Sequence, residues 1–454
     1  LLLRNAGDGT FTIVDQPAVQ TFARTSGALF ADLDNNGTLE LFVSNNARAK
    51  SRRTEEPQRS AQLQLSQFFR NDNGTLIDIT QASGVCPPEL QSVRNVGVFD
   101  YDADGLLDLY LVEDKFRPGT SRSTLFRNEG NLKFRDVTVE AKLPEDVFGL
   151  GLAVADLNED RLPDFFVPHS NRFFLSVGDG TYREPESLRE LFAWEPLHGE
   201  DWPCGAAFGD LNGDGRLDLV LAIHCTTARN KVYLNRGLRD GVPVFEDVTE
   251  AAGLGDVIPA RCPHVEIQDF DNDGKPDIYL SAAWKDESGN IVPLIYRQVG
   301  ISAEGIPRFE PPRPIEEGMV YFPAGPSGDF NNDGRLDLFL INWFEENHSR
   351  LLINKSSREN HWLRVKPVGK VNNRMGIGAV VKVYKTGGLN DPQALIAVQE
   401  VTTGYGYASG QAATPHFGLG THKLVDLVVS FPNEMNVEMR NVKTDRELTI
   451  EEQN

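Results

Sequence analysis

Six short acidic segments carry the clearest chemical signal in this sequence, and we number them loops 1 to 6 in chain order. Each spans nine residues, with Asp, Asn or Glu at positions 1, 3, 5 and 9, and five of the six have Gly at position 6. Such side chains supply the oxygen ligands that Ca²⁺ prefers, a backbone carbonyl at position 7 can add another, and the glycine permits a sharp turn. The candidate ligands are Asp32, Asp34, Asn36, Thr38 and Glu40 in loop 1; Asp100, Asp102, Asp104, Leu106 and Asp108 in loop 2; Asp156, Asn158, Asp160 and Asp164 in loop 3; Asp210, Asn212, Asp214, Arg216 and Asp218 in loop 4; Asp269, Asp271, Asp273, Lys275 and Asp277 in loop 5; and Asp329, Asn331, Asp333, Arg335 and Asp337 in loop 6.

The acidic loops are not EF-hands. An EF-hand requires a bidentate Glu at position 12 and a following helix. Position 12 is Val or Leu in all six loops, within apolar runs that are typical of strands. We therefore expect each acidic loop to join two strands.

Loop 3 departs from the pattern, because Arg161 replaces the glycine. Clusters of Asp, Asn and Gly also form simple turns, but six copies in one register favour a metal site, because carboxylates packed together repel one another without a cation. We expect up to six structural Ca²⁺ ions. Loops 2 and 5, with four carboxylates each, should fill first, and loop 3 should be the weakest site.

A repeated unit positions the acidic loops. They recur every 54 to 68 residues, and between them lies a strand, a Gly/Asn turn and another strand, as in Phe69–Leu76 and Phe126–Phe134. One unit thus holds four strands, and repeats of this length in an all-β chain indicate a propeller. We expect a β-propeller over residues 1–357 and a small all-β domain over residues 358–454.

These motifs carry a family resemblance. The repeated loops resemble the FG-GAP/VCBS repeats of calcium-binding propellers over roughly residues 1–355, which implies seven blades, the first truncated or completed by ring closure; six blades is the alternative. The segments Arg374–Tyr384, Gly404–Ser409 and His416–Gly420 resemble the ASPIC/UnbV domain that follows such repeats in the cartilage acidic protein 1 family.

The amino-acid composition limits which classes of partner and which cellular compartment we expect. The 454 residues include 66 acidic and 45 basic residues, for a formal net charge of −21. This argues against nucleic acid, because phosphate binding requires clusters of Lys and Arg. No run of about 18 apolar residues is present, so we expect no transmembrane segment. Four cysteines in a calcium-rich chain suit an oxidising compartment, so we expect a secreted, extracellular or periplasmic protein.

Histidines and cysteines gather where the propeller mouth opposite the acidic loops should lie. Cys204 and Cys225 flank loop 4 nearly symmetrically, so antiparallel pairing predicts a disulfide between them. A slip of one residue would instead set His224 opposite Cys204 and leave both thiols for a soft metal. The full set is His169, His198, Cys204, His224, Cys225, Cys262 and His264, with Arg24, Arg94 and Arg261.

Together these features predict a non-enzymatic, calcium-stabilised binding or scaffold protein that presents propeller loops to a protein or glycan partner. Two alternatives stay open. One is a metal-dependent enzyme that uses the His/Cys set at the mouth. The other is a subunit of a larger extracytoplasmic assembly.

Overall fold

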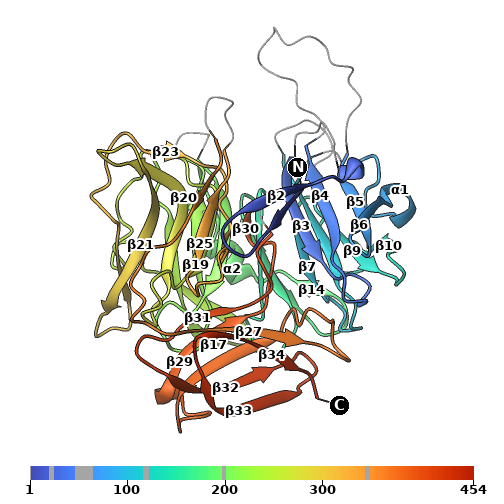
Figure 1. Ribbon diagram of the computed structural model, residues 1–454. Coiled ribbons are helices and arrows are strands. Elements are labelled where there is room, and N and C mark those ends of the chain that lie inside the picture. Colours follow the sequence, from blue (N-terminus) through green and yellow to red (C-terminus); the bar gives the residue numbers. More distant parts are fainter. Residues whose placement is uncertain are drawn as a thin grey trace.

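The computed structural model describes residues 2–19, 25–46, 65–90, 92–115, 122–196, 201–342, 348–408 and 410–453. The fold is all-β: blades stand around a common axis, and a C-terminal domain lies against one face of the ring (Figure 1). The strand after each acidic loop is buried along most of its length, as in β8 (Asp108–Glu113) and β16 (Asp218–Ile223). Neighbouring sheets cover both of its faces, which explains why these strands are continuous apolar runs.

Six sheets follow one plan, in which the acidic loop joins the first two strands. The strands of blades 1 to 3 are β3 (Thr25–Ala31), β4 (Glu40–Asn45), β5 (Gln67–Asp72) and β6 (Thr75–Asp78); β7 (Val93–Phe99), β8, β9 (Thr124–Asn128) and β10 (Phe134–Asp136); and β11 (Gly151–Ala155), β12 (Asp164–Val167), β13 (Arg172–Ser176) and β14 (Tyr182–Arg183). Those of blades 4 to 6 are β15 (Pro203–Gly209), β16, β17 (Lys231–Arg239) and β18 (Val242–Asp247); β19 (Val265–Gln268), β20 (Asp277–Lys285), β21 (Ile291–Ile301) and β22 (Pro307–Glu310), with β23 (Val320–Tyr321) beside β20; and β24 (Ser327–Gly328), β25 (Asp337–Leu340) and β26 (Arg350–Leu352). Short helices α1 (Thr80–Ser83), α2 (Glu186–Leu191) and η1 (Pro17–Val19) lie between strands.

The N-terminal hairpin of β1 (Leu2–Asn5) and β2 (Phe11–Val14) closes the ring. In blade 2, the Asn128 side chain donates to Leu33 O of blade 1, 2.7 Å away. Asn5 makes the same bond, at 2.9 Å, to Phe330 O of blade 6. On the side of the hairpin away from blade 6, the Gln16 side chain donates to Gly74 O of blade 1. The hairpin therefore occupies the third and fourth strand positions of a seventh blade.

The C-terminal domain holds two sheets, ordered β31-β27-β34 and β29-β28-β32-β33. Its apolar residues continue the core of blades 1 and 2 in one cluster. The predicted division at residues 357 and 358 lies between β26 and the first strand of this domain. Its elements are β27 (Trp362–Val368), β28 (Val380–Lys385), η2 (Pro392–Ala394), β29 (Leu395–Glu400), β30 (Gly406–Tyr407), β31 (His416–Gly418), β32 (Leu424–Ser430), β33 (Asn436–Lys443) and β34 (Arg446–Glu451).

One segment of the C-terminal domain, residues 403–408 together with 410 and 411, runs among the first strands of the blades, and we call it the channel segment. Its strand β30 lies near the centre of the ring (Figure 1). It pairs with β11 of blade 3, which places Gly151 opposite Tyr407. The Asn95 side chain of blade 2 donates to Gly404 O, and the Tyr407 N–H donates to His264 Nδ1 of blade 5. A Cβ on Gly151 would lie 2.0 Å from Gly406 O, so only glycine permits this approach.

Candidate metal loops and the interdomain cavity

The six acidic loops share one backbone geometry. In each, the N–H of position 6 donates to the position 1 carboxylate at 2.7–2.9 Å. Position 6 has a positive φ in every loop, including Arg161, whose φ is 68°. The Arg161 guanidinium donates to Phe431 O of the C-terminal domain. Replacing the glycine of loop 3 has therefore left its turn intact.

Acidic side chains converge most closely in loops 1, 2 and 5. In each of these loops, three carboxylates offer oxygens that lie within 4.8 Å of one another. Position 3 of loops 3, 4 and 6 is Asn, whose side-chain N–H donates to the position 5 carboxylate at 2.9–3.2 Å. The converging groups are Asp32, Asp34 and Glu40; Asp100, Asp102 and Asp108; and Asp269, Asp271 and Asp273.

The position 9 carboxylates have a second role that the sequence did not reveal. Both oxygens of Asp108 accept backbone hydrogen bonds, one from Tyr101 N in the loop and one from Asn128 N in the third strand. The other five loops repeat this pair of bonds. Position 9 therefore ties each acidic loop to the third strand of its blade.

Burial makes the loops electrostatically costly. It raises the pKa of Asp269 to about 8, and the charge of Asp277 adds to the effect, while the Gly274 N–H opposes it. Burial likewise raises the pKa of Asp100 to about 7 and that of Asp277 to about 7, against their backbone hydrogen bonds. A bound cation would favour the ionised forms of these groups.

Basic side chains partly offset the negative charge of the acidic loops. Arg127 lies 2.7 Å from Asp102 and 3.0 Å from Asp104 in loop 2. At position 7, the Lys275 ammonium lies 2.6 Å from Asp273, its position 5 partner. Arg216 and Arg335, also at position 7, pair in the same way with Asp214 and Asp333. These cations contact position 5 and would have to yield to a metal there.

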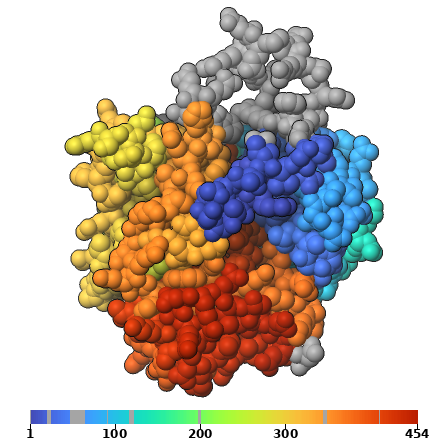
Figure 2. Space-filling view, in the orientation of Figure 1, coloured from blue at the N-terminus to red at the C-terminus, as the bar shows by residue number. Residues whose placement is uncertain are grey.

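The C-terminal domain covers the face that carries the acidic loops (Figures 1 and 2). Each loop has its own contact. Three loops form hydrogen bonds with this domain, each 2.8 Å long: Asn35 Oδ1 of loop 1 accepts the Arg374 N–H, the Asp156 N–H of loop 3 donates to Glu400 Oε2, and Asn272 Oδ1 of loop 5 bonds to His416 Nε2. Loops 2 and 4 pack against it, with Gly105 beside Val371 O and Gly215 beside Leu395. In loop 6, Asp329 forms an ion pair with Arg364 at 3.4 Å. The acidic loops thus lie between the propeller and the C-terminal domain, a position that no pattern in the sequence predicted.

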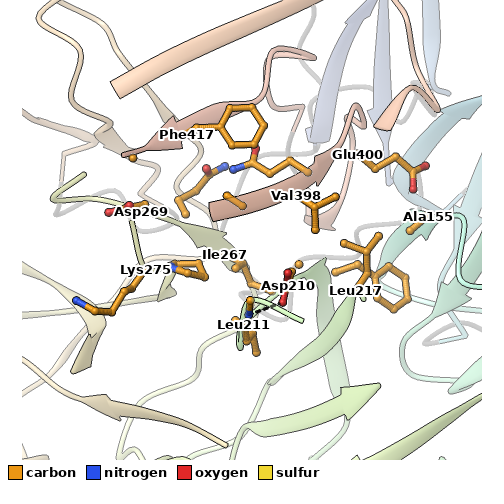
Figure 3. Close-up of a pocket in the computed structure, with 18 of the residues that line it drawn as sticks. Ala155, Asp210, Leu211, Leu217, Ile267, Asp269, Lys275, Val398, Glu400 and Phe417 are labelled. Carbon is orange, nitrogen blue, oxygen red and sulfur yellow. Dashed lines mark hydrogen bonds between the residues drawn. The ribbon is translucent and has the colours of Figure 1, made fainter. Parts of the chain in front are cut away.

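A cavity of about 230 Å³ lies in this interface, between blades 3 to 5 and strands β29 and β31 (Figure 3). Its apolar lining includes Ala155, Leu217, Ile267, Val398 and Phe417. The carboxyl group of Glu400 also lines it. Burial raises the pKa of Glu400 well above its usual range, and the charge of Asp156 raises it further.

Family models identify both parts of the chain. A model described as FG-GAP-like repeat matches residues 1–43, 100–167 and 210–280, and a model described as ASPIC and UnbV matches residues 369–454. The chain consists of FG-GAP-like repeats followed by an ASPIC/UnbV domain.

The chain is also homologous to cartilage acidic protein 1. It is 26% identical to the Homo sapiens protein over 443 residues, which is 92% of this chain and 61% of that protein. It is 25% identical to the Mus musculus protein over 432 residues, 90% of this chain and again 61% of the relative. The chain thus spans about three-fifths of the length of these relatives.

Solved structures resemble the molecule only loosely. An Agrocybe aegerita lectin, described as recognising non-reducing terminal N-acetylglucosamine, is 16% identical with a TM-score of 0.43, over 78% of this chain and 88% of that chain. A structure described as the Dos1 propeller is 11% identical with a TM-score of 0.30, over 95% of each chain. In the described part of the FG-GAP and ASPIC/UnbV domains, no helix has the length and apolar character needed to span a membrane.

The predicted disulfide is wrong, because all four cysteines are free. In blade 4, Pro203 pairs with Ile223 and Gly205 pairs with Ala222, so the register shifts at Cys204. Cys225 lies beyond the end of β16, and its Sγ lies 3.1 Å from Thr227 Oγ1. A bulge in the FG-GAP blade therefore separates two cysteines that a regular ladder would have paired.

Among the described residues, the histidines do not form the soft-metal site considered from the sequence. His264 is fully buried, and its Nε2 lies 3.2 Å from Glu266 Oε1. His169 and His224 each stack on Trp202, with ring centroids 5.4 and 6.0 Å away. Within the described residues, the groups of three convergent His, Cys, Asp or Glu ligands all belong to FG-GAP acidic loops. His198 and Arg24 lie outside the described residues.

Proposed function

We propose that this chain is a calcium-stabilised, extracytoplasmic binding or scaffold protein, in which the acidic loops hold Ca²⁺ beneath the ASPIC/UnbV domain. The convergence of three carboxylates within 4.8 Å in loops 1, 2 and 5 carries this proposal. All six loops share the same turn, so up to six ions fit the pattern. Oxygen-only ligand sets with a positive-φ turn suit Ca²⁺ better than a transition metal.

Charge supports the same conclusion. The chain has a formal net charge of −21, and the loops concentrate carboxylates beneath another domain. Buried like charges destabilise a fold unless a cation offsets them. Each bound Ca²⁺ would remove repulsion within its loop, and in loop 3 it would also remove repulsion between Asp156 and Glu400. The ions would thus hold the two domains together as well as each hairpin.

Partner binding belongs on the opposite face of the propeller, because the ASPIC/UnbV domain covers the loop face. Loops that project from a rigid ring commonly bind proteins or glycans. A secreted, extracellular or periplasmic location fits Ca²⁺ loading, and the name of the relatives, cartilage acidic protein 1, refers to cartilage. A pull-down from native extract, with and without chelator, would identify the protein or glycan partner.

The test combines elemental analysis with thermal melting. We expect Ca²⁺, and no stoichiometric Zn, Cu or Fe, in protein purified without chelator. EDTA should lower the melting temperature by many degrees, because each site at 100-fold saturation contributes about 2.7 kcal/mol. Ca²⁺ should restore it, and Mg²⁺ should restore it only in part.

Matched variants locate the effect. Asp269→Asn should weaken Ca²⁺ binding, whereas Asp256→Asn, at an exposed residue outside the loops, should leave it unchanged. Unchanged melting in EDTA, with no Ca²⁺ in the purified protein, would overturn the proposal. Stoichiometric Zn, Cu or Fe would favour the metal-dependent enzyme instead.

A further inference from the structure

Blade 7 differs from the other blades in its strand pairing. Its described residues supply two strands, β1 and β2, which form a two-stranded sheet between blade 6 and blade 1 (Figure 1). In blades 1 to 5 the third strand pairs with the second strand on one side and with the fourth on the other. β1 takes the third position, and among the described strands it pairs with β2 alone. Its inner edge therefore presents backbone N–H and C=O groups that other blades pair with another strand.

Side chains that the other blades bury are exposed beside this edge. The run Leu-Leu-Arg-Asn of β1 matches Leu-Phe-Arg-Asn of β9 in blade 2. Leu3 is 42% exposed, whereas Phe126 at the same place in β9 is 2% exposed. In blade 1, Phe30 of β3 is 40% exposed, whereas Val154 at the same place in blade 3 is 8% exposed and packs in one cluster with blade 2. This position of the first strand faces the preceding blade, so Phe30 faces blade 7.

Two asparagine side chains indicate which backbone groups belong beside β1. In blade 2, the Asn128 side chain donates to the carbonyl at position 2 of the preceding loop and to that at position 8 of its own loop. Asn354 of blade 6 repeats both bonds. Among the described residues, Asn5 bonds only to the preceding loop, and Asn71 of blade 1 bonds only to its own loop. The two remaining acceptors correspond to positions 8 and 2 of a seventh acidic loop.

The backbone of Asn5 indicates the same partner. In blades 1 to 6, the position 9 carboxylate accepts the N–H of the equivalent residue, as Asp108 does from Asn128. Asn128 is 1% exposed, whereas Asn5 is exposed and no described carboxylate accepts its N–H. The acidic pattern occurs six times in the sequence, and blades 1 to 6 use all six copies. A seventh copy therefore has to come from outside these 454 residues.

We propose that a strand–acidic loop–strand hairpin from outside the 454 residues pairs with the inner edge of β1, completes blade 7 and brings a seventh Ca²⁺ site. The metal part of this inference rests on the proposed function, whereas the strand pairing does not. Position 9 of the added loop would accept the Asn5 N–H, and the added strands would cover Leu3 and Phe30. Strand addition of this kind combines main-chain hydrogen bonds with the burial of alternate side chains.

A tethered copy of the blade 2 hairpin tests the inference. By sequence, Leu1 corresponds to Thr124, so a copy of residues 93–123 fused in front of the full chain reproduces the spacing of blade 2. The copy should slow hydrogen exchange at the amides of residues 2–5 by at least about tenfold, because these amides become paired or buried. Equilibrium dialysis should find one more Ca²⁺ per chain. A fused segment of the same composition in scrambled order should do neither.

Matched variants of the fused chain locate the contact. Leu3→Asp should reduce the added protection by at least about fivefold, because it places a charge where the copy would bury an apolar side chain. Ile13→Asp should change it less than about twofold, since this residue lies on the outer strand, where blade 2 has the exposed Asp136. Asp108→Asn, made only in the copied loop, should reduce protection of the Asn5 amide and weaken the added Ca²⁺ site.

The two readouts separate this inference from the proposed function. If neither the fused nor the unfused chain binds Ca²⁺, the proposed function fails, and exchange at residues 2–5 still decides the pairing. Absence of added protection, or equal protection by the scrambled segment, would overturn the inference. So would a dimer of the unfused chain, detected by light scattering, in which residues 2–5 are already protected, because a second copy would then cover this edge. Protection without an added Ca²⁺ would overturn the seventh metal site.

Discussion

At the scale of single residues, the ninth side chain of each acidic loop links ligand chemistry to architecture. Asp108 is fully buried and accepts backbone N–H groups from both its loop and the third strand. A carboxylate in this position is therefore needed even without metal. Asp102, at position 3 of loop 2, forms an ion pair with Arg127 and is a candidate Ca²⁺ ligand. Its contribution to stability should therefore depend on whether Ca²⁺ is bound.

Substitution by the matching amide should separate these roles. In EDTA, Asp108→Asn should destabilise the chain by about 1–3 kcal/mol, because its NH₂ group would face a backbone N–H donor. Asp102→Asn should cost less than about 1 kcal/mol in EDTA, since it loses only a partly exposed ion pair. In Ca²⁺, both should lose stability. Urea unfolding in each condition measures this, and equal costs in EDTA would contradict it.

The raised pKa values predict opposite pH trends with and without metal. Because the folded pKa of Asp269 is about 8 and that of Asp100 about 7, the metal-free fold binds protons more tightly than the unfolded chain. That stability is complete below about pH 4 and is lost as pH rises through about 8, at ~1.4 kcal/mol per pKa unit for each group.

Ca²⁺ requires the ionised groups, so its stabilising effect should grow over the same range. Melting temperatures measured from about pH 5 to about pH 8 should therefore fall with pH in EDTA, and the gap between Ca²⁺ and EDTA should widen. A metal-free melting temperature that rises steadily across this range would contradict the assignment.

At the scale of elements, the hairpins, the Gly/Asn turns and the all-β C-terminal region could be predicted because strand and turn patterns are local. The Cys204–Cys225 disulfide could not, because a bulge at Cys204 shifts the register, and no local pattern marks it. The interdomain position of the loops was also hidden, since contacts such as Asp156 with Glu400 join residues 244 apart. Arg161 departs from the glycine pattern of the other loops, but it adopts the same φ region as those glycines.

The acidic loops should still differ in affinity. Loops 2 and 5 have four carboxylates each and should fill first. Loop 3 has three, with Arg161 in place of the glycine, and should fill last. Anomalous difference density from crystals grown at limiting Ca²⁺ measures the order, and the strongest peak at Asp156 would reverse this ranking.

At the scale of the whole molecule, the propeller and the ASPIC/UnbV domain share a hydrophobic core, so we expect them to unfold in one transition. The channel segment contacts the first strands of several blades, and Gln411 bonds to Glu266, which is fully buried. Their cores are continuous through blades 1 and 2. Loss of the channel segment would leave His264 and Glu266 without these partners.

Two glycine substitutions test this dependence. Gly406 and Gly387 have φ values of 79° and 81°, but a Cβ would lie 2.4 Å from His264 Nδ1 at Gly406 and in open space at Gly387. Gly387→Ala should cost about 1 kcal/mol, and Gly406→Ala should cost clearly more and lower the melting of both domains in one transition. Equal costs, or separate melting of the two domains, would contradict the cooperative description.

The channel segment also sets an order of events in time. Residues near 404 contact residues near 95, and the N-terminal hairpin meets blade 6 across 325 positions of sequence. Blades made early on the ribosome cannot complete their inner contacts until the channel segment has been synthesised. Long-range closure of this kind is slow. The centre of the nascent propeller therefore stays incomplete until the ASPIC/UnbV domain has left the ribosome, so the order of synthesis sets the order in which the molecule can fold.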